Sequence, residues 1–583
     1  MNSLKHTVYR VSALLLALLL SAPAALGGED FPGWIPPELE PRFSETGQGG
    51  PLLRAAPLPE AYGFSRGPDG ALEVFGQTAV RSQGSNGVCW AFSAFAAAEA
   101  NMLRAGAVEP DLSETHMIYS TSQYGASALD IANAEQGYST RPSQGGNIYY
   151  AASYLMRGTV LGGVLPEAAD PYTASSLLYR SMDVTREKGG MRAFTVRDIP
   201  IIWSAKNGIY DPAAADSVRE MTEIKTAVMD FGAVSTSIYW NTGSQNYNPD
   251  TGAYYVKARY TANHAVAIVG WDDAYPAENF RRLPPGDGAW LIKNSWGTGA
   301  GEGGSGYYWV SYYDGRIGEW TYAIDGVADF DPSAIVHEYD YRLDNTLCGY
   351  DAYVLFFPRE AEAERLEAVK LLLNSPAVLE IGICGDFRPR DMEAISPDDF
   401  SFVQTVRKEK PGFYTVALEH PVTVTGEYFA ICVTVLSDAE ETEFYGYKCA
   451  SLPMLETGDG GYDAVAVHNA KTGRWEHVSE QQNLVPCIKA VAKRLGDPEI
   501  RAAEPLGDTL RLTVDTGAAG EALAVAAAYR DGRMLRCAMA SVTLRPGENT
   551  AALPLSSDGG TLVKVFLLDP ETLAPLCPSW EGA

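Results

Sequence analysis

The chain has 583 residues, and a prior of ~150 residues per domain predicts three or four domains rather than a single core. Hydrophobic residues make up 46% of it and charged residues 20%, which argues against a largely disordered chain. The formal net charge of −28 repels phosphate backbones, so we expect a well-solvated acidic surface and no nucleic-acid partner.

The N-terminal residues 1–27 have the three parts of a signal peptide. Lys5 and Arg10 flank the start of an apolar run over residues 11–20, and small residues follow it. The run is too short to cross a bilayer. We therefore expect export, no membrane span after signal removal, and a secreted, extracellular or cell-surface location.

Residues 28–58 are rich in Pro and Gly, which predicts a spacer or short pro-segment with little regular structure. Helical and strand patterns mix over residues 59–329. Apolar residues at helical spacing predict a helix over residues 89–104 with one apolar face. A second helix is predicted between Asn147, a suitable N-cap, and Gly158.

Further along this region, EIKTAVMDFGAVSTSIYW predicts a helix that passes into a strand at Gly232. HAVAIVGWDD, GAWLIKNSW and GYYWVSYYD are rich in Val, Ile, Trp and Tyr and predict strands. DDAYPAENFRRLPPGDGA is expected to be a surface loop. Asp272 and Asp273 are expected to form a solvated strand end, and we expect no metal and no cofactor.

Beyond Asp329 the sequence predicts short strands separated by turns, in two all-β regions over residues 335–495 and 497–583. The length and regular strand spacing of the second region predict a small Ig-like sandwich. The two regions contain seven of the eight cysteines, an odd number that cannot all pair within the chain.

Cys89 is the remaining cysteine, and it follows a glycine-rich turn and precedes the helix-like WAFSAFAAAEA. A lone thiol is more often a packed core residue. A thiol at a helix N-terminus can instead be a nucleophile, because that position stabilises the thiolate. The choice depends on whether the chain also supplies a base.

The chain does supply the groups that a nucleophilic thiol needs. His264 opens a predicted strand and can face a helix terminus across a cleft, whereas His116 has no partner pattern and is expected to be structural. Asn294 is suited to orient the imidazole. The backbone N–H of Cys89 and the side-chain amide of Gln83 can stabilise an oxyanion.

QGSNGVCWAFS, NHAVAIVGW and KNSWGTGAGEGGSGYYWV resemble, in order, the three signature blocks of papain-like cysteine peptidases. The resemblance implies a two-lobed α+β catalytic domain, Cys89 as nucleophile and His264 as general base and acid. It also implies Asn294 as the orienting residue and Gln83 as an oxyanion-hole donor.

The same resemblance implies the substrate-binding residues. Gly145 and Gly146 resemble the family's glycine wall, whose backbone pairs with an extended substrate. Trp296 is expected to cover the Asn–His hydrogen bond from water. Ser237 and Ala265 are expected to line the pocket for a hydrophobic substrate residue.

The sequence departs from the family pattern in several places. Asn86 and Ser143 stand where the family has a disulfide-bonded cysteine pair. Residues 28–58 are too short for the family's long inhibitory propeptide, which leaves the basis of latency open. His264 follows Cys89 by 175 residues, a longer interval than usual, and we place the excess in residues 173–220 at the cleft rim.

Residues 335–495 resemble the lectin-like β domain that follows papain-type catalytic domains in some secreted bacterial proteins. The resemblance implies a sandwich that binds carbohydrate or cell wall, and a mere spacer is an equal alternative. The predicted fold is thus a papain-like domain, one lectin-like β-sandwich and a small Ig-like β-sandwich.

We therefore predict a secreted bacterial cysteine endopeptidase that acts on polypeptides through a Cys89 thioester. Two alternatives stay open. One is a cell-surface or carbohydrate-binding protein that uses the peptidase fold as a scaffold. The other is a cell-wall peptide hydrolase.

Overall fold

The computed structural model describes residues 33–37, 57–122, 141, 143–157, 164–174, 193–203, 210–241, 243, 245–340, 343, 345–347, 349–388, 395, 399–400, 402–437, 444–448, 454–457, 460–477, 484–530, 533–555 and 562–582. The chain divides into two compact units at Asp329 and Phe330. The predicted signal peptide lies outside the described residues, as does most of the predicted spacer.

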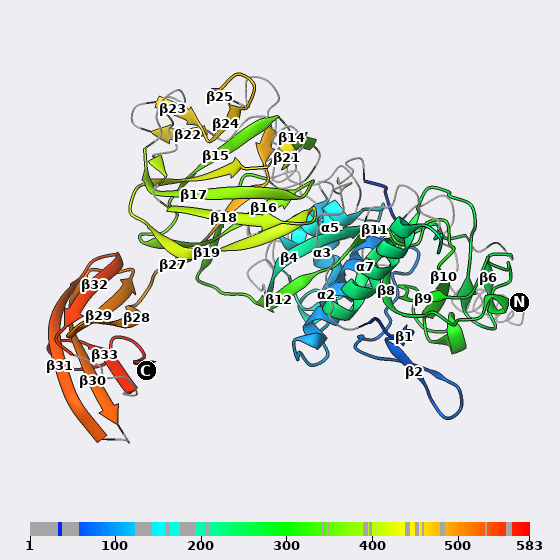
Figure 1. The fold of residues 1–583 in the computed structure, drawn as a ribbon, viewed down its shortest axis with the longest axis horizontal. Coiled ribbons are helices and arrows are strands. Elements are labelled where there is room, and N and C mark those ends of the chain that lie inside the picture. Colours follow the sequence, from blue (N-terminus) through cyan, green and yellow to red (C-terminus); the bar gives the residue numbers. More distant parts are fainter. Residues whose placement is uncertain are drawn as a thin grey trace, which may run out of the picture. The chain divides into compact units, whose positions relative to one another are not determined.

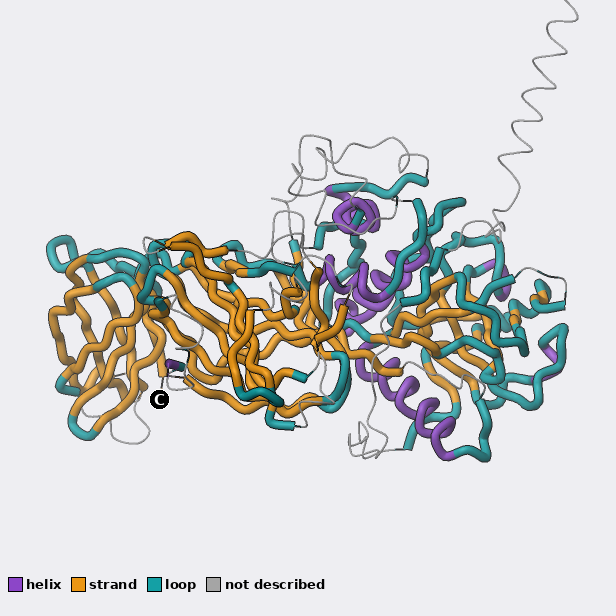
Figure 2. The backbone as a smooth tube through the Cα atoms, turned by 90° about the horizontal axis from the view of Figure 1, so that it is seen from above, coloured by secondary structure: helices purple, strands orange, loops and turns teal. Residues whose placement is uncertain are grey.

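The first unit contains the four α-helices of the described residues, drawn in purple in Figure 2. They are α2 (Cys89–Arg104), α3 (Glu114–Thr121), α5 (Ile148–Leu155) and α7 (Ala215–Phe231). The side chain of Asn147 caps α5 by accepting a hydrogen bond from the N–H of Tyr149 at 2.9 Å, as predicted. The helix ends at Leu155, before the predicted end at Gly158, which lies outside the described residues.

Helix α2 has the predicted bounds but is buried on more than one face. Every residue from Cys89 to Met102 is buried, because α3 and α5 pack on one side of the helix and strands on the other. Its many alanines allow this close approach from both sides. The prediction of a single apolar face was therefore wrong.

A mixed sheet is the other large part of the first unit (Figure 1). Its strands run in the order β12 (Asp325–Asp329), β4 (Phe194–Trp203), β11 (Glu319–Tyr322), β5 (Val234–Ile238), β8 (His264–Asp272), β9 (Ala289–Lys293), β10 (Tyr307–Ser311), β7 (Ala253–Tyr254) and β6 (Tyr247–Asn248). All pairs are antiparallel except β10 with β7. The three runs predicted as strands are thus confirmed as β8, β9 and β10.

Short elements complete the first unit. They are β1 (Ala61–Tyr62), which pairs with the end of β8, the hairpin of β2 (Phe64–Arg66) and β3 (Leu72–Val74), and the 3-10 turns η2 (Glu167–Ala169), η4 (Ala277–Asn279) and η5 (Glu302–Gly304). Asp273 is the second residue of the predicted surface loop, and it is not merely solvated. Its carboxylate accepts hydrogen bonds from Lys225 and from the hydroxyl of Tyr312.

The second unit is built from strands. One sheet contains β13 (Ala334–His337), β14 (Asn345–Leu347), β16 (Glu364–Leu373), β19 (Gly412–Val424), β21 (Phe444–Lys448), β26 (Leu484–Pro486) and β27 (Ile488–Arg494). A second sheet has the order β18 (Phe402–Lys408), β17 (Ala377–Phe387), β20 (Tyr428–Val435), β15 (Tyr350–Pro358), β24 (Val465–Asn469) and β25 (Arg474–His477). β22 (Met454–Thr457) and β23 (Gly460–Asp463) form a hairpin.

These two sheets share one hydrophobic core. On β15, Tyr353, Leu355 and Phe357 belong to that core together with Leu371 of β16. The alternate residues of β15, such as Val354, belong to a second cluster on the opposite face of the sheet. The period of two along a strand therefore explains why β15 is apolar from Ala352 to Phe357.

The last part of the second unit contains two smaller sheets. One has β28 (Glu499–Leu506), β29 (Thr509–Thr516) and β32 (Gly547–Leu553); the other has β31 (Arg533–Leu544), β30 (Gly520–Arg530), β33 (Leu562–Leu568) and β34 (Trp580–Gly582). Leu512 of the first and Val565 of the second belong to one buried cluster. Among the cysteines of the described residues, Cys89, Cys432, Cys537 and Cys577 are free thiols.

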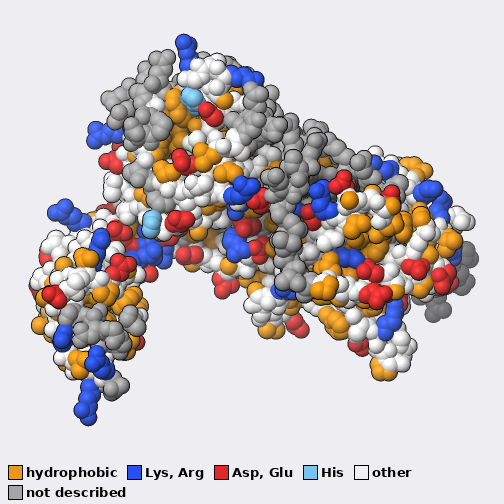
Figure 3. Space-filling model, in the orientation of Figure 1, with side chains coloured by type: hydrophobic (Ala, Val, Ile, Leu, Met, Phe, Trp, Pro, Cys, Tyr) orange, Lys and Arg blue, Asp and Glu red, His pale blue; other side chains and the backbone are white. Residues whose placement is uncertain are grey.

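Acidic and basic side chains are intermixed on the face of the molecule that Figure 3 shows. Among the described residues, no helix has the length and apolarity needed to cross a membrane.

The second unit contains a buried cluster of charged side chains whose contribution to stability can be measured. Lys489 Nζ lies 2.8 Å from Glu338 Oε2 and 2.8 Å from Asp340 Oδ2, and all three side chains are buried. We predict that Lys489→Met lowers the free energy of unfolding by about 3–5 kcal/mol, because it removes a buried ammonium that both carboxylates contact. Denaturant unfolding of the full chain measures this loss.

Lys493→Met on the same strand is the matched control. Lys493 Nζ lies 3.7 Å from Glu499 Oε2 and both groups are partly exposed, so its loss costs at most ~1 kcal/mol. Equal effects of the two substitutions would contradict a stabilising role for the buried cluster.

Candidate active site

Cys89 is the first residue of α2 and lies where that helix meets the sheet. Its Sγ accepts a hydrogen bond from the backbone N–H of Ala265 at 3.3 Å, so the thiol lies beside the start of β8. The free N–H groups of the first helical turn also point toward this end of α2. The structure therefore brings the predicted nucleophile next to His264, although 175 residues separate them in the sequence.

His264 is held in one orientation by Asn294. The Nε2 of His264 and the Oδ1 of Asn294 are 2.9 Å apart, and the same Oδ1 accepts a hydrogen bond from the N–H of Ser295 at 2.8 Å. The amide oxygen is an acceptor, so Nε2 carries the proton and Nδ1 is the nitrogen left to act as a base. Asn294 thus has the geometry predicted for the orienting residue.

Two tryptophans cover the His264–Asn294 pair. The ring of Trp296 stacks on His264 with centroids 4.6 Å apart and an interplanar angle of 19°. Trp240 packs edge-on against both rings, at 5.0 Å from Trp296 and 6.2 Å from His264. Trp296 thus lies against the His264 ring, and its shielding of the hydrogen bond stays a prediction; Trp240 is an addition that the sequence analysis missed.

Gln83 lies in the same site, and both the oxygen and the nitrogen of its side-chain amide make hydrogen bonds. Its Oε1 accepts from the hydroxyl of Ser295 at 2.5 Å, and its Nε2 donates to the carbonyl of Asn86 at 2.6 Å. Its backbone N–H donates to the carbonyl of Ser295 at 2.8 Å. Gln83 is thus fixed beside Asn294 by a neighbour on each side.

A five-residue segment, Gly33–Pro37, lies against this site. The position that a Cβ of Gly33 would take is 2.6 Å from the Sγ of Cys89, so only glycine fits directly over the thiol. Trp34 has no exposed surface. The predicted spacer therefore contains an ordered segment that covers the candidate nucleophile.

Backbone hydrogen bonds hold this cleft segment (residues 33–37). The N–H of Trp34 donates to the carbonyl of Asn263 at 3.2 Å, and the N–H of Ile35 donates to the carbonyl of Gly146 at 2.9 Å. Trp34 and Gly146 form a parallel β-bridge. The predicted glycine wall thus pairs with an extended chain here, and that chain is the protein's own N-terminal region.

The remaining predicted substrate residues also lie near Cys89. Gly145 has a φ of +49° and lies beside Gly87, which precedes the thiol by two positions. Ser237 and Ala265 are register partners on β5 and β8, and both are buried. The hydroxyl of Ser237 donates to the carbonyl of Glu319 at 2.9 Å.

Burial determines the protonation state of Cys89 and His264. Burial raises the pKa of the Cys89 thiol to about 12, although the N–H groups of Ala265 and Trp90 favour the thiolate. Burial also lowers the pKa of His264 to about 4, against the effect of its hydrogen bond with Asn294. At pH 7 the covered pair is therefore a neutral thiol and a neutral imidazole.

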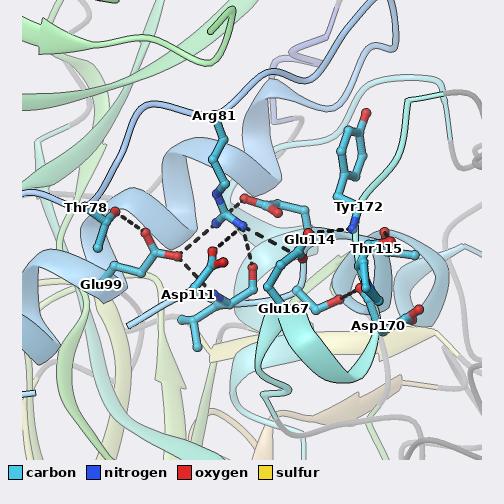
Figure 4. Close-up of polar contacts among 12 residues, drawn as sticks. Thr78, Arg81, Glu99, Asp111, Glu114, Thr115, Glu167, Asp170 and Tyr172 are labelled. Carbon is cyan, nitrogen blue, oxygen red and sulfur yellow. Dashed lines mark hydrogen bonds and ion pairs between the residues drawn. The ribbon is translucent and has the colours of Figure 1, made fainter. Parts of the chain in front are cut away.

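Figure 4 shows a partly buried charge cluster around Arg81 that the sequence analysis missed. The Arg81 guanidinium lies 2.9 Å from Glu99, 2.7 Å from Asp111 and 2.6 Å from Glu114. Glu99 falls within the apolar spacing of the predicted helix over 89–104. An acidic residue at such a position needs a buried cation, and that was the available signal.

His116 lies apart from these groups. It is fully buried in α3, and its Nδ1 lies 2.8 Å from the hydroxyl of Tyr154 on α5. This contact joins the two helices, as expected of a structural histidine.

The comparisons with known proteins agree with this geometry. Residues 73–320 match the family described as papain family cysteine protease. Residues 73–320 form a papain-family domain. Cysteine proteinase 1 of Entamoeba histolytica is 29% identical over 235 residues, which are 39% of this chain and 58% of that protein. Peptidase 1 of Dermatophagoides farinae is 26% identical over 231 residues, which are 40% of this chain and 57% of that protein.

The match thus spans about 57–58% of the length of these curated relatives. A solved structure of the cysteine protease and lectin-like domains of Cwp84, a surface layer associated protein of Clostridium difficile, is 20% identical. The match covers 83% of this chain and 96% of that one, with a TM-score of 0.58. The likeness shows that this chain shares the fold of a papain-like domain with a C-terminal lectin-like region.

The close approach of Gly33 to Cys89 leads to a prediction about the reactivity of the thiol. Gly33→Ala places a Cβ 2.6 Å from the Sγ of Cys89, a contact too short to keep, so we expect the cleft segment to be displaced and water to reach the pair. The pKa of Cys89 then falls from about 12 and that of His264 rises from about 4. We predict at least about tenfold faster alkylation of Cys89 by iodoacetamide at pH 7, with the site of reaction mapped by mass spectrometry.

The pH profiles should differ in the same way. In the natural chain the alkylation rate of Cys89 should keep rising up to pH 10, because the thiol is still protonated there. The Gly33→Ala rate should reach a plateau near neutral pH. Pro36→Ala is the control, because Pro36 is exposed in the same segment and its change introduces no clash. An equal, slow rate for Gly33→Ala and the natural chain would contradict a covered thiol.

Proposed function

We propose that the chain is a cysteine endopeptidase that is latent while the cleft segment is in place. The observation that carries this proposal is the constellation of Cys89 at the start of α2, His264 at the start of β8 and Asn294 hydrogen-bonded to that histidine. This constellation can form a thiolate, hold an imidazole in one tautomer and exclude water from their contact.

In the proposed reaction, displacement of residues 33–37 exposes the thiol to a polypeptide. His264 Nδ1 accepts the thiol proton, and the Cys89 thiolate attacks the scissile carbonyl carbon. The imidazolium then protonates the leaving amine as the C–N bond breaks. A water molecule deprotonated by His264 hydrolyses the thioester and regenerates the thiol.

Charge develops on the carbonyl oxygen in both steps of this reaction. The backbone N–H of Cys89 and the Nε2 of Gln83 are the proposed donors to that oxygen. Gln83 is suited to this role because Ser295 fixes its amide oxygen at 2.5 Å, and because Nε2, which donates one hydrogen to the Asn86 carbonyl, has a second hydrogen for the oxyanion. We propose that Gly146 pairs with the substrate backbone in place of Ile35, and that Ser237 and Ala265 line a side-chain pocket.

We further propose that the protein is bacterial and secreted, and acts outside the cell or at its surface, where the β region beyond residue 329 contacts carbohydrate or cell wall. The signal-like N-terminus supports this location, as does the fold shared with a surface layer associated protein. The competing function is a cell-wall peptide hydrolase, and its substrate is peptidoglycan rather than protein.

Full-length Gly33→Ala is the form that tests the activity. We predict that it hydrolyses casein, and that a peptidyl epoxide directed at papain-type thiols labels Cys89. Adding His264→Ala should slow both reactions by at least about 10²-fold, and adding Cys89→Ala should abolish them. Mass spectrometry distinguishes an adduct at Cys89 from adducts at the other cysteines.

The outcomes separate the alternatives. Release of stem peptides from purified peptidoglycan, with casein intact, would favour the cell-wall hydrolase. No adduct at Cys89 in the Gly33→Ala chain would exclude an activated thiol and favour a binding protein that retains the peptidase fold.

A further inference from the structure

Residues 83–88 form a turn that carries Gln83 at one end and leads into α2 at the other. A second segment, residues 172–174, contacts this turn at three points. The hydroxyl of Tyr172 donates to the carbonyl of Gln83 at 2.7 Å, and the Nδ2 of Asn86 donates to the carbonyl of Ala174 at 2.9 Å. Between them, Gly84 packs so closely on Ala174 that an added Cβ would lie 2.5 Å from the Cβ of that alanine.

The hydroxyl of Tyr172 joins two residues of the turn, Gln83 and Asn86. It donates to Gln83 and accepts a hydrogen bond from the Nδ2 of Asn86 at 3.2 Å. Burial raises the pKa of Tyr172 above its ordinary value, so the hydroxyl keeps its proton and remains a donor at any working pH. Asn86 in turn uses its carbonyl to accept from Gln83 Nε2 at 2.6 Å.

Tyr172 is itself held firmly, as Figure 4 shows. Its backbone N–H donates to Glu167 Oε1 at 2.6 Å, and Glu167 lies 3.8 Å from the Arg81 guanidinium. Its ring packs edge-on against Phe92, one turn along α2 from the thiol, with centroids 4.9 Å apart. The contacts of Tyr172 thus connect the charge cluster around Arg81 to the Gln83 carbonyl.

The same region lacks a covalent cross-link. The papain-like family has a cysteine at the position of Asn86, bonded to one at the position of Ser143. In this chain the two segments are joined by a hydrogen bond from the N–H of Gly87 to the carbonyl of Ser143 at 3.0 Å. The Asn86 side chain instead points to Tyr172 and Ala174.

We propose that Tyr172 is a positioning residue for the oxyanion side of the active site, and that its hydroxyl fixes the Gln83 peptide through the Gln83–Tyr172–Asn86 hydrogen bonds. This inference rests on the proposed function, because it assigns a purpose to Gln83. Tyr172 contacts no reacting atom. It limits the movement of the residue that donates to the developing oxyanion, and a displaced donor stabilises that charge poorly.

The role predicts which reactions of Cys89 need Tyr172. Formation of a tetrahedral adduct with a peptide aldehyde places a negative oxygen in the oxyanion hole. Alkylation by iodoacetamide forms a C–S bond and releases iodide with no oxyanion. Loss of the Tyr172 hydroxyl should therefore weaken the first reaction and leave the second unchanged.

The test compares Tyr172→Phe with the natural tyrosine in the full-length Gly33→Ala chain. We expect kcat for a peptide substrate to fall roughly 10-fold, less than the ~10²–10³-fold loss of an oxyanion donor itself. KM should change less than about twofold. Aldehyde affinity should fall by the same factor as kcat, and the iodoacetamide rate should stay within about twofold.

Tyr154→Phe is the matched control. It also removes a buried hydroxyl, in this case one that contacts His116 rather than the oxyanion turn. We expect it to leave kcat and the aldehyde affinity unchanged. A double-mutant cycle with Gln83→Ala tests whether Tyr172 acts through Gln83. If it does, Tyr172→Phe should cause little further loss of kcat once the Gln83 amide is absent.

Each result decides the proposal. Equal kcat for Tyr172→Phe and its parent would overturn it, as would a parallel fall in the aldehyde and iodoacetamide reactions, which would indicate a general structural loss. Additive effects in the cycle would also overturn it. If the Gly33→Ala parent forms no aldehyde adduct, the proposed function fails and this role fails with it.

Discussion

The contact between the Sγ of Cys89 and the backbone N–H of Ala265 is the point on which the first unit depends. It joins the start of a helix to the start of a strand, and so brings together two segments that are 175 residues apart. The antiparallel pairing of β8 with β9 then places Asn294, just after β9, beside His264. Packing of α2 against β8 thus fixes the positions of all three groups.

The cleft segment combines two chemical effects. Gly33 blocks access to the sulfur, and burial keeps the sulfur protonated. A thiol that is both covered and neutral is a poor nucleophile. The five-residue cleft segment is thus placed to suppress the reactivity of Cys89, and a backbone hydrogen bond to Gly146 of the glycine wall holds it there.

Much of the first unit could be predicted from the sequence because its information is local. A glycine-rich turn before an alanine-rich segment predicted Cys89 at a helix N-terminus, and β-branched and aromatic runs predicted the strands that begin with His264 or end before Asn294. The fold of the region beyond residue 329 was predicted less sharply, because alternating strands specify a sheet but not its neighbours.

The parts that were missed depend on contacts between distant residues. Nothing in the spacing of Gly33 and Trp34 indicates that they would pair with Gly146, because an extended segment has no periodicity of its own to detect. Burial of Glu99 depends on Arg81, which lies outside the helix.

The complete coverage of Cys89 also bears on oxidation. Thiol–disulfide exchange requires a thiolate with access to a disulfide, and peroxide oxidation has the same requirements. Cys537, in contrast, is exposed on the surface of the second unit. In an oxidising medium, exposed thiols such as Cys537 can therefore form mixed disulfides while the sulfur beneath Gly33 stays reduced. The cleft segment thus protects Cys89 from oxidation until the segment is removed.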